Sequence, residues 1–336
     1  MTSKFSVLGL ALCLFSTSQG AALENHCQAT SNWPGWAGLK NAFVFGDSYS
    51  TTGFNASGIQ PTPTNPLGNP TYPGYTSSNG PNWVDYLTVK YNSSTLLTYN
   101  LAHGGATISS ALVAPYDPQV SSVADQIQNQ WFPVYAGSPA STPWSSNNTL
   151  FAIFDGINDI GYTWYLGTDA TKVLHAKIFA VYRGLVDSLY YAGGRNFAFL
   201  SVPPFDRAPM ALAQPATDQA AQKAAISAWN SALMEMINAV KDEKPEANIF
   251  LVDANKYFTQ VLDNPKTYNQ TAGYKNTTAY CVAYENGTPS PTEFNATCGV
   301  PVNEYFWLNS LHPTPPIHDV LAEQVSLQLK AGPNVC

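Results

Sequence analysis

Short, uninterrupted apolar runs recur along this chain and alternate with longer helical patterns. The apolar runs lie at residues 42–45, 150–154, 197–202 and 249–252. Continuous apolar runs of this length are typical of parallel strands that are buried on both faces. The helical patterns lie at residues 83–91, 120–135, 170–191, 217–241 and 318–330. The alternation predicts an α/β fold with a central parallel sheet.

The composition fits a folded protein and excludes several classes of partner. The chain has 336 residues, of which 45% are hydrophobic and 13% aromatic, and this argues against disorder. Its 15 Lys and Arg against 22 Asp and Glu give a net charge of −7, and no basic run occurs. We therefore expect no nucleic-acid partner. No zinc spacing, P-loop or dinucleotide fingerprint is present, so we expect no metal and no organic cofactor.

The first twenty residues have the pattern of a secretory signal peptide. Lys4 precedes an apolar run at residues 5–15, and Ser18 and Gly20 offer a cleavage point before Ala21. A transmembrane anchor needs about 20 apolar residues, and this run is roughly half as long. We expect residues 1–20 to be removed on export. Residues 21–336 would then form a single secreted domain without stable insertion into a membrane.

The cysteines and glycosylation sequons fit an exported protein. Removal of the signal peptide leaves four cysteines, which allow three pairings. We prefer a local Cys281–Cys298 bridge and a Cys27–Cys336 bridge between the two ends of the chain, and the other pairings stay open. Sequons for N-glycosylation, which are candidate glycan sites, occur at Asn55, Asn92, Asn147, Asn269, Asn276, Asn286 and Asn295.

Polar and glycine-rich segments follow the ends of the predicted strands. Ser48 follows the first run, Gly104 and Gly105 follow a strand-like stretch at residues 96–99, and Asn158 follows the next run. His312 precedes the last helical pattern. Ligands of open α/β sheets bind at the carboxyl ends of the strands. A serine hydroxyl, an imidazole base and amide donors are the groups that acyl transfer needs. For Ser48 alone, a helix N-cap is the alternative interpretation.

This set of residues, in this order, resembles the SGNH hydrolases, also called GDSL lipases and esterases. The resemblance rests on Gly46-Asp47-Ser48, Gly105, Gly156-Ile157-Asn158-Asp159 and His312. It implies a flavodoxin-like three-layer sandwich with a central parallel sheet. It also implies that Ser48 attacks an ester carbonyl, that His312 takes its proton, and that an oxyanion hole forms from the backbone N–H groups of Ser48 and Gly105 with the side chain of Asn158. No G-x-S-x-G motif occurs, which disfavours an α/β-hydrolase.

The sequence departs from the family pattern at position 309. The family has Asp three residues before the histidine, and this chain has Asn309. In a serine protease the same change lowers kcat about 10⁴-fold by favouring the wrong imidazole tautomer. Asn309 could accept from the imidazole through its amide oxygen, or a backbone carbonyl could do so and leave a Ser–His dyad. Asp319 or Glu304 could also approach from outside the motif, but neither has the expected spacing, so we favour the first two arrangements.

Several other residues keep two interpretations. His103, beside the glycines, is either a substrate contact or a structural histidine, and we favour the structural role. His318 and His312 do not have a recognised metal-ligand spacing. The aromatic residues Tyr162, Trp164 and Tyr165 either wall the pocket or pack in the core.

The acidic charge balance and dense sequons look like those of secreted fungal members of the family, among them the family-sixteen carbohydrate esterases. This resemblance implies an acetylesterase acting on a small ester or an acetylated oligosaccharide, and we expect a monomer. A lipase or short-chain acyl-lipid esterase is the close alternative. A non-catalytic carbohydrate-binding or cell-wall protein is the alternative of another class.

Overall fold

The fold is built on one five-stranded parallel sheet. The computed structural model describes Met1 and residues 27–336, so nearly all of the predicted signal peptide lies outside the described residues. The strand order is β2-β1-β3-β4-β5, and all neighbours pair in parallel. The strands are β1 (Asn41–Gly46), β2 (Leu97–Asn100), β3 (Thr149–Phe154), β4 (Asn196–Leu200) and β5 (Asn248–Val252). The α/β fold with a parallel sheet is therefore confirmed.

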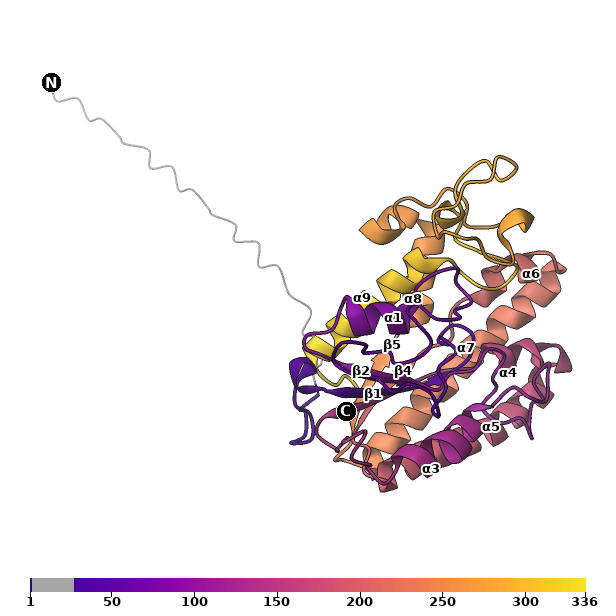
Figure 1. Cartoon of the computed structure of the whole chain (residues 1–336). Helices are drawn as coiled ribbons and strands as arrows, with labels where there is room; N and C mark the ends of the chain where they lie inside the picture. Colours follow the sequence, from indigo (N-terminus) through magenta and orange to yellow (C-terminus); the bar gives the residue numbers. More distant parts are fainter. Residues whose placement is uncertain (2–26) are drawn as a thin grey trace.

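Helices cover both faces of the sheet (Figure 1). One face carries α1 (Trp83–Val89), α8 (Ala254–Asp263) and α9 (Pro315–Ala331). The other face carries α3 (Phe132–Tyr135), α5 (Thr168–Tyr191) and α7 (Ala216–Glu243). The remaining short helices are α2 (Val123–Asp125), α4 (Ile157–Gly161) and α6 (Pro209–Leu212). Short 3₁₀ turns lie at Trp36–Gly38, Trp164–Leu166, Phe205–Arg207, Pro265–Thr267, Asn269–Thr271, Val282–Tyr284 and Val302–Glu304.

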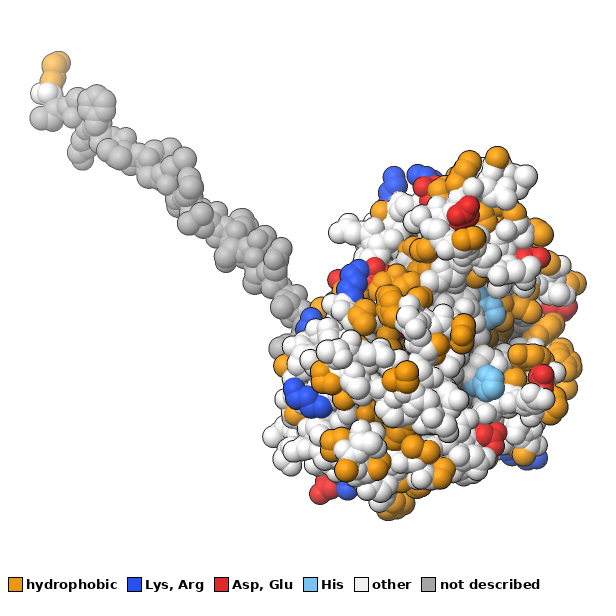
Figure 2. Space-filling model, viewed as in Figure 1, with side chains coloured by type: hydrophobic (Ala, Val, Ile, Leu, Met, Phe, Trp, Pro, Cys, Tyr) orange, Lys and Arg blue, Asp and Glu red, His pale blue; other side chains and the backbone are white. Residues whose placement is uncertain are grey.

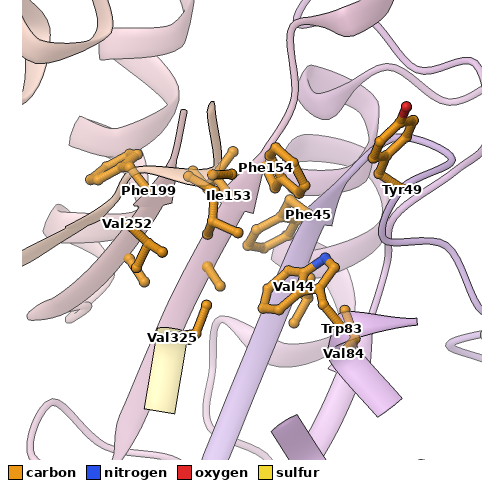
Figure 3. Close-up of a cluster of buried hydrophobic side chains, with 14 of the residues drawn as sticks. Val44, Phe45, Tyr49, Trp83, Val84, Ile153, Phe154, Phe199, Val252 and Val325 are labelled. Carbon is orange, nitrogen blue, oxygen red and sulfur yellow. The ribbon is translucent and has the colours of Figure 1, made fainter. Parts of the chain in front are cut away.

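The core follows from strands that are apolar on both faces. Phe45, Phe151 and Phe199 are fully buried, and one hydrophobic cluster extends from Trp36 to Val335. At the carboxyl end of β3, the ring of Phe154 lies 6.3 Å from that of Trp83 in α1 and 6.2 Å from that of Tyr49 (Figure 3). This packing fixes the turn after β1, in which Tyr49 lies, against the sheet.

The predicted helix at residues 120–135 is interrupted. It consists of α2, a π-helical turn at Gln126–Trp131, and α3. The buried Gln126 side chain accepts from the Gly46 N–H and donates to the Gly46 carbonyl, both at 2.9 Å. These two bonds tie the π-helical turn to the carboxyl end of β1. Such turns inside helices are frequently found at functional sites.

The two ends of the chain are joined beside the edge strand β5. Disulfides link Cys27 to Cys336 and Cys281 to Cys298, which is the pairing preferred from the sequence. Val335 forms an antiparallel bridge with Ile249 of β5. The Asn334 side chain accepts from the Leu251 N–H at 2.8 Å and donates to the Leu251 carbonyl at 2.9 Å. The carboxyl-terminal tail therefore occupies the backbone groups of this strand on its outer side.

Candidate active site

The turn after β1 presents Ser48 at the carboxyl edge of the sheet. The N–H groups of Ser50 and Thr51 donate to the Asp47 carbonyl, and the Tyr49 N–H donates to the Asp47 side chain at 2.9 Å. A side chain at Gly46 would bring its Cβ to 2.1 Å from the Phe154 carbonyl oxygen of β3. Only glycine therefore fits where the chain leaves the sheet and turns toward Ser48.

The structure brings Ser48, His312 and Asn309 together. His312 Nε2 lies 2.8 Å from Ser48 Oγ, and His312 Nδ1 lies 3.1 Å from Asn309 Oδ1. The same Asn309 oxygen accepts from the backbone N–H groups of Leu311 at 3.0 Å and His312 at 2.9 Å. Because only an amide oxygen can accept these bonds, the oxygen and not the NH₂ group faces the ring. The imidazole then carries its proton on Nδ1 and leaves Nε2 free to accept from Ser48.

The acids considered as substitutes for the family Asp do not reach His312. Asp319 binds Lys90 Nζ at 2.6 Å and the Tyr91 hydroxyl at 2.7 Å. Within the described residues, no hydrogen bond or ion pair joins Glu304 to His312. Burial lowers the pKa of His312 to about 4, and no carboxylate offsets this effect. The imidazole is therefore neutral at pH 7.

The loop after β2, which carries Gly105, passes beside Ser48 and is bonded to Asn158. A Cβ built on Gly104 would lie 3.8 Å from the Ser48 Cβ, so the loop after β2 passes directly beside the serine. Asn158 Nδ2, at the start of α4, donates to the Ala106 carbonyl of that loop at 2.8 Å. In the described part of the chain, the backbone N–H groups of Ser48 and Gly105 have no acceptor. These donors are free to bind a ligand oxygen.

Three buried carboxyl groups behind this edge were not singled out from the sequence. Asp47, Asp155 and Asp159 are each at most 2% exposed. Asp159 accepts from the Ile108 N–H at 3.1 Å, so it holds the loop that follows Gly105. Burial raises the pKa of Asp47 and of Asp159 to about 7, and burial with the neighbouring acids raises that of Asp155 well above its usual range. Asp47 and Asp159 lie in the Gly-Asp-Ser and G-x-N-D motifs, and Asp155 directly precedes the second motif, but the sequence did not show that the three carboxyl groups lie close together.

Asp47→Asn is expected to stabilise the protein relative to the wild type, and this difference in stability is expected to grow as the pH rises. The raised pKa means that ionisation of Asp47 destabilises the folded state as the pH passes from about 4 to about 7. Asn keeps the oxygen that accepts from Tyr49 and cannot ionise. The unfolding free energy of the variant minus that of the wild type should increase by as much as about 4 kcal/mol between pH 4 and pH 8, at about 1.4 kcal/mol per pKa unit. Urea unfolding at the two pH values measures this, with the exposed Asp242→Asn as control. A constant difference would contradict the expectation.

His103 and His318, the other histidines named from the sequence, form no hydrogen bond with Ser48 or His312 in the described residues. His103 Nδ1 accepts from the Ser121 N–H at 3.1 Å. His318 is buried, and the Tyr49 ring lies 5.9 Å from the ring of His312 and 6.1 Å from that of His318. Among the described residues, no group of three or more His, Cys, Asp or Glu side chains could hold a metal ion. Tyr162 and Tyr165 are 37% and 64% exposed, so core packing does not account for them, whereas Trp164 is partly buried and packs against the core.

Comparison with known proteins identifies the family. The model of the GDSL-like lipase/acylhydrolase family matches residues 43–325. The chain belongs to this family. An acetylesterase of Thermothelomyces thermophilus is 36% identical over 317 residues, which cover 94% of this chain and 95% of that protein. A phosphatidylcholine-sterol acyltransferase of Aeromonas hydrophila is 26% identical over 67% of this chain and 61% of that protein. This GDSL-family protein is thus a carboxylic ester hydrolase.

Among solved structures, the acetylxylan esterase Axe2 of Geobacillus stearothermophilus aligns with this GDSL-family chain at a TM-score of 0.48 and 13% identity, over 88% of this chain and 96% of that chain. Within the part of the chain that the structure describes, none of the helices is long and apolar enough to cross a membrane.

Proposed function

We propose that this protein is a secreted serine esterase that removes acetyl groups from carbohydrate esters. The observation that carries the proposal is the 2.8 Å contact between His312 Nε2 and Ser48 Oγ, with Nδ1 held by Asn309. A nucleophile, a base in hydrogen-bond reach and a group that orients the base are what a serine hydrolase requires.

In the proposed reaction, Ser48 Oγ attacks the ester carbonyl carbon while its proton passes to His312 Nε2. The negative oxygen of the tetrahedral intermediate accepts from the backbone N–H groups of Ser48 and Gly105 and from the Asn158 amide. The intermediate collapses when His312 returns the proton to the leaving alcohol, and an acyl-enzyme on Ser48 remains. Water, activated by the same imidazole, releases the acid and regenerates Ser48.

Asn309 orients the base in this proposal without adding charge. In proteases with an Asp at this place, substitution by Asn fails because the wrong tautomer is favoured. Here the two backbone N–H groups of Leu311 and His312 fix the amide oxygen toward the ring. The neutral Asn309 side chain can therefore hold His312 in the tautomer that carries its proton on Nδ1.

Asn309→Asp is expected to shift the acid limb of the pH–activity profile to higher pH. His312 must be neutral to accept a proton, and its pKa of about 4 keeps it neutral down to mildly acidic pH. A carboxylate at position 309 favours the imidazolium and should raise that pKa by about 1 to 3 units. The variant should keep or exceed wild-type kcat at pH 8 and lose activity near pH 5. Profiles of kcat/KM from pH 4 to 9 measure this, and a collapse of activity at pH 8 would point to another role for Asn309.

The acetyl group and the carbohydrate are supported to different extents. The related acetylesterase supports a short acyl group. The carbohydrate part of the substrate rests on the sequence resemblance. Esters from acetate to octanoate distinguish the acyl-lipid alternative, because activity that rises with chain length would exclude an acetylesterase. Two disulfides and the predicted signal peptide support secretion.

Covalent labelling tests the proposed chemistry directly. A fluorophosphonate probe should label the wild type, and peptide mapping should find the adduct on Ser48. Ser48→Ala should not be labelled, whereas Ser310→Ala, in the loop of His312, should be labelled as well as the wild type. A folded wild type that does not react would favour the non-catalytic binding protein.

A further inference from the structure

A cavity lies beside the segment that follows the proposed catalytic serine, on the β2 side. It has a volume of about 430 Å³ and lies between residues 51–57, residues 101–103 and the helical segment at residues 121–134. Its wall includes His103, whose backbone N–H donates to the Gly46 carbonyl at 3.0 Å. The next residue, Gly104, passes beside Ser48. A substrate held at Ser48 can therefore extend into this cavity.

The cavity wall carries no formal charge. None of its lining residues is Asp, Glu, Lys or Arg, and they combine hydroxyl, amide and imidazole groups with apolar side chains. Two histidine side chains appear at the surface along one hollow of the molecule (Figure 2), and His103 and His312 are the described histidines that are not buried. An uncharged wall of this kind does not suit a phosphate or a carboxylate.

The polar groups of this wall offer both donors and acceptors. His103 Nδ1 accepts from the Ser121 N–H, so the proton of the neutral ring is on Nε2, and this donor has no acceptor among the described residues. Gln130 Nε2 donates to Ser121 Oγ at 3.0 Å, which leaves its Oε1 as an acceptor. The Thr51 hydroxyl likewise has no partner in residues 27–336. A wall that offers both donors and acceptors matches the hydroxyl groups of a sugar, each of which can donate and accept.

We infer that this cavity binds a neutral sugar unit in the alcohol part of the ester, and that His103 Nε2 donates a hydrogen bond to one of its hydroxyl groups. The inference rests on the proposed function, because it needs an ester at Ser48. Leu101, Ala102 and Val134 provide apolar contact for the C–H faces of a sugar ring. An acyl chain in the same place would leave the His103 and Thr51 groups without partners.

The test uses two substitutions of His103. They separate the proposed hydrogen bond from Nε2 to the sugar from the structural hydrogen bond that Nδ1 accepts from the Ser121 N–H. Asn can place its oxygen where His103 Nδ1 lies, so His103→Asn keeps the bond from Ser121 and removes the Nε2 donor. Gln can place its amide nitrogen near the Nε2 position, so His103→Gln keeps the donor. The quantity measured is the ratio of kcat/KM for acetylated xylotriose to kcat/KM for ethyl acetate, whose alcohol is too small to fill the cavity.

His103→Asn and the isosteric Thr51→Val should each lower this ratio about 3- to 10-fold, mainly through KM for the oligosaccharide, which is the usual contribution of one hydrogen bond. His103→Gln should stay within about 2-fold of the wild type, and so should Tyr191→Ala, which removes an exposed ring at the far end of α5. Asn55, a predicted glycosylation site, also lines the cavity, so proteins made with and without N-glycosylation are compared.

An unchanged ratio in both His103→Asn and Thr51→Val, or an equal loss on both substrates, overturns the inference. A loss in His103→Gln as large as in His103→Asn overturns the role of the Nε2 donor. A wild type that hydrolyses ethyl acetate and not acetylated xylotriose overturns the sugar site and leaves the esterase intact. A wild type that hydrolyses neither ester and resists the fluorophosphonate instead removes the proposed function itself.

Discussion

Ser48→Ala and His312→Ala are each expected to lower kcat for an acetate ester by about 10⁶-fold, and the double variant is expected to be no slower than either. The two side chains act as one unit through the contact at 2.8 Å. A serine without its base is a weak nucleophile, and a base without the serine has no proton to accept. Removal of the second group therefore removes nothing further.

The measurement is hydrolysis of ethyl acetate under saturating conditions for the wild type, both single variants and the double variant. Ser310→Ala is the matched control, because this serine lies in the loop of His312 and its side chain forms no hydrogen bond in the described structure. Losses that multiply in the double variant would mean that Ser48 and His312 act independently. That result would contradict the shared proton transfer.

Asn158→Ala is expected to lower kcat by about 10²- to 10³-fold with little change in KM, because it removes one donor to the negative oxygen of the transition state. The backbone donors of Ser48 and Gly105 remain, so the loss is smaller than that of Ser48→Ala. The neutral ester needs this donor less than the negatively charged transition state does. The substitution should therefore lower kcat and leave KM nearly unchanged.

Asn158 also donates to the Ala106 carbonyl, so a structural effect has to be separated from a catalytic one. Thermal unfolding of the variant measures the structural contribution. A folded variant whose loss lies in KM alone would contradict the role in the oxyanion hole. A variant with the kcat of the wild type would indicate that the backbone N–H groups of Ser48 and Gly105 form the oxyanion hole without Asn158.

The strands were predicted because their signal is local. Each buried strand is a continuous apolar run, and burial on both faces leaves little choice of sequence. The break in the helix at residues 120–135 depends instead on Gln126 bonding Gly46, which is 80 positions earlier. Helix α8 was not predicted either, although the spacing of its buried residues Ala254, Phe258, Val261 and Leu262 is that of one helix face, so this local signal was missed.

The candidate site likewise has features that local motifs predict and features that depend on contacts between distant segments. Ser48, Asn158 and His312 could be named because short motifs carry them and because strand ends meet at one edge of the sheet. The arrangement at Asn309 could not be chosen, since it depends on which backbone N–H groups hold the amide oxygen. The burial of Asp47, Asp155 and Asp159 and the cavity beside His103 depend on packing between distant segments, which no local pattern encodes.

The tail that runs along β5 has a consequence for self-association. A bare edge strand offers a row of backbone groups to any other strand, and this is a common route to aggregation. Here Asn334 and Val335 already engage the backbone of Ile249 and Leu251, and the Cys27–Cys336 bridge fastens the tail. Reduction of that one covalent link would leave the tail held by hydrogen bonds alone, and a second molecule could then displace it more easily from this pairing surface.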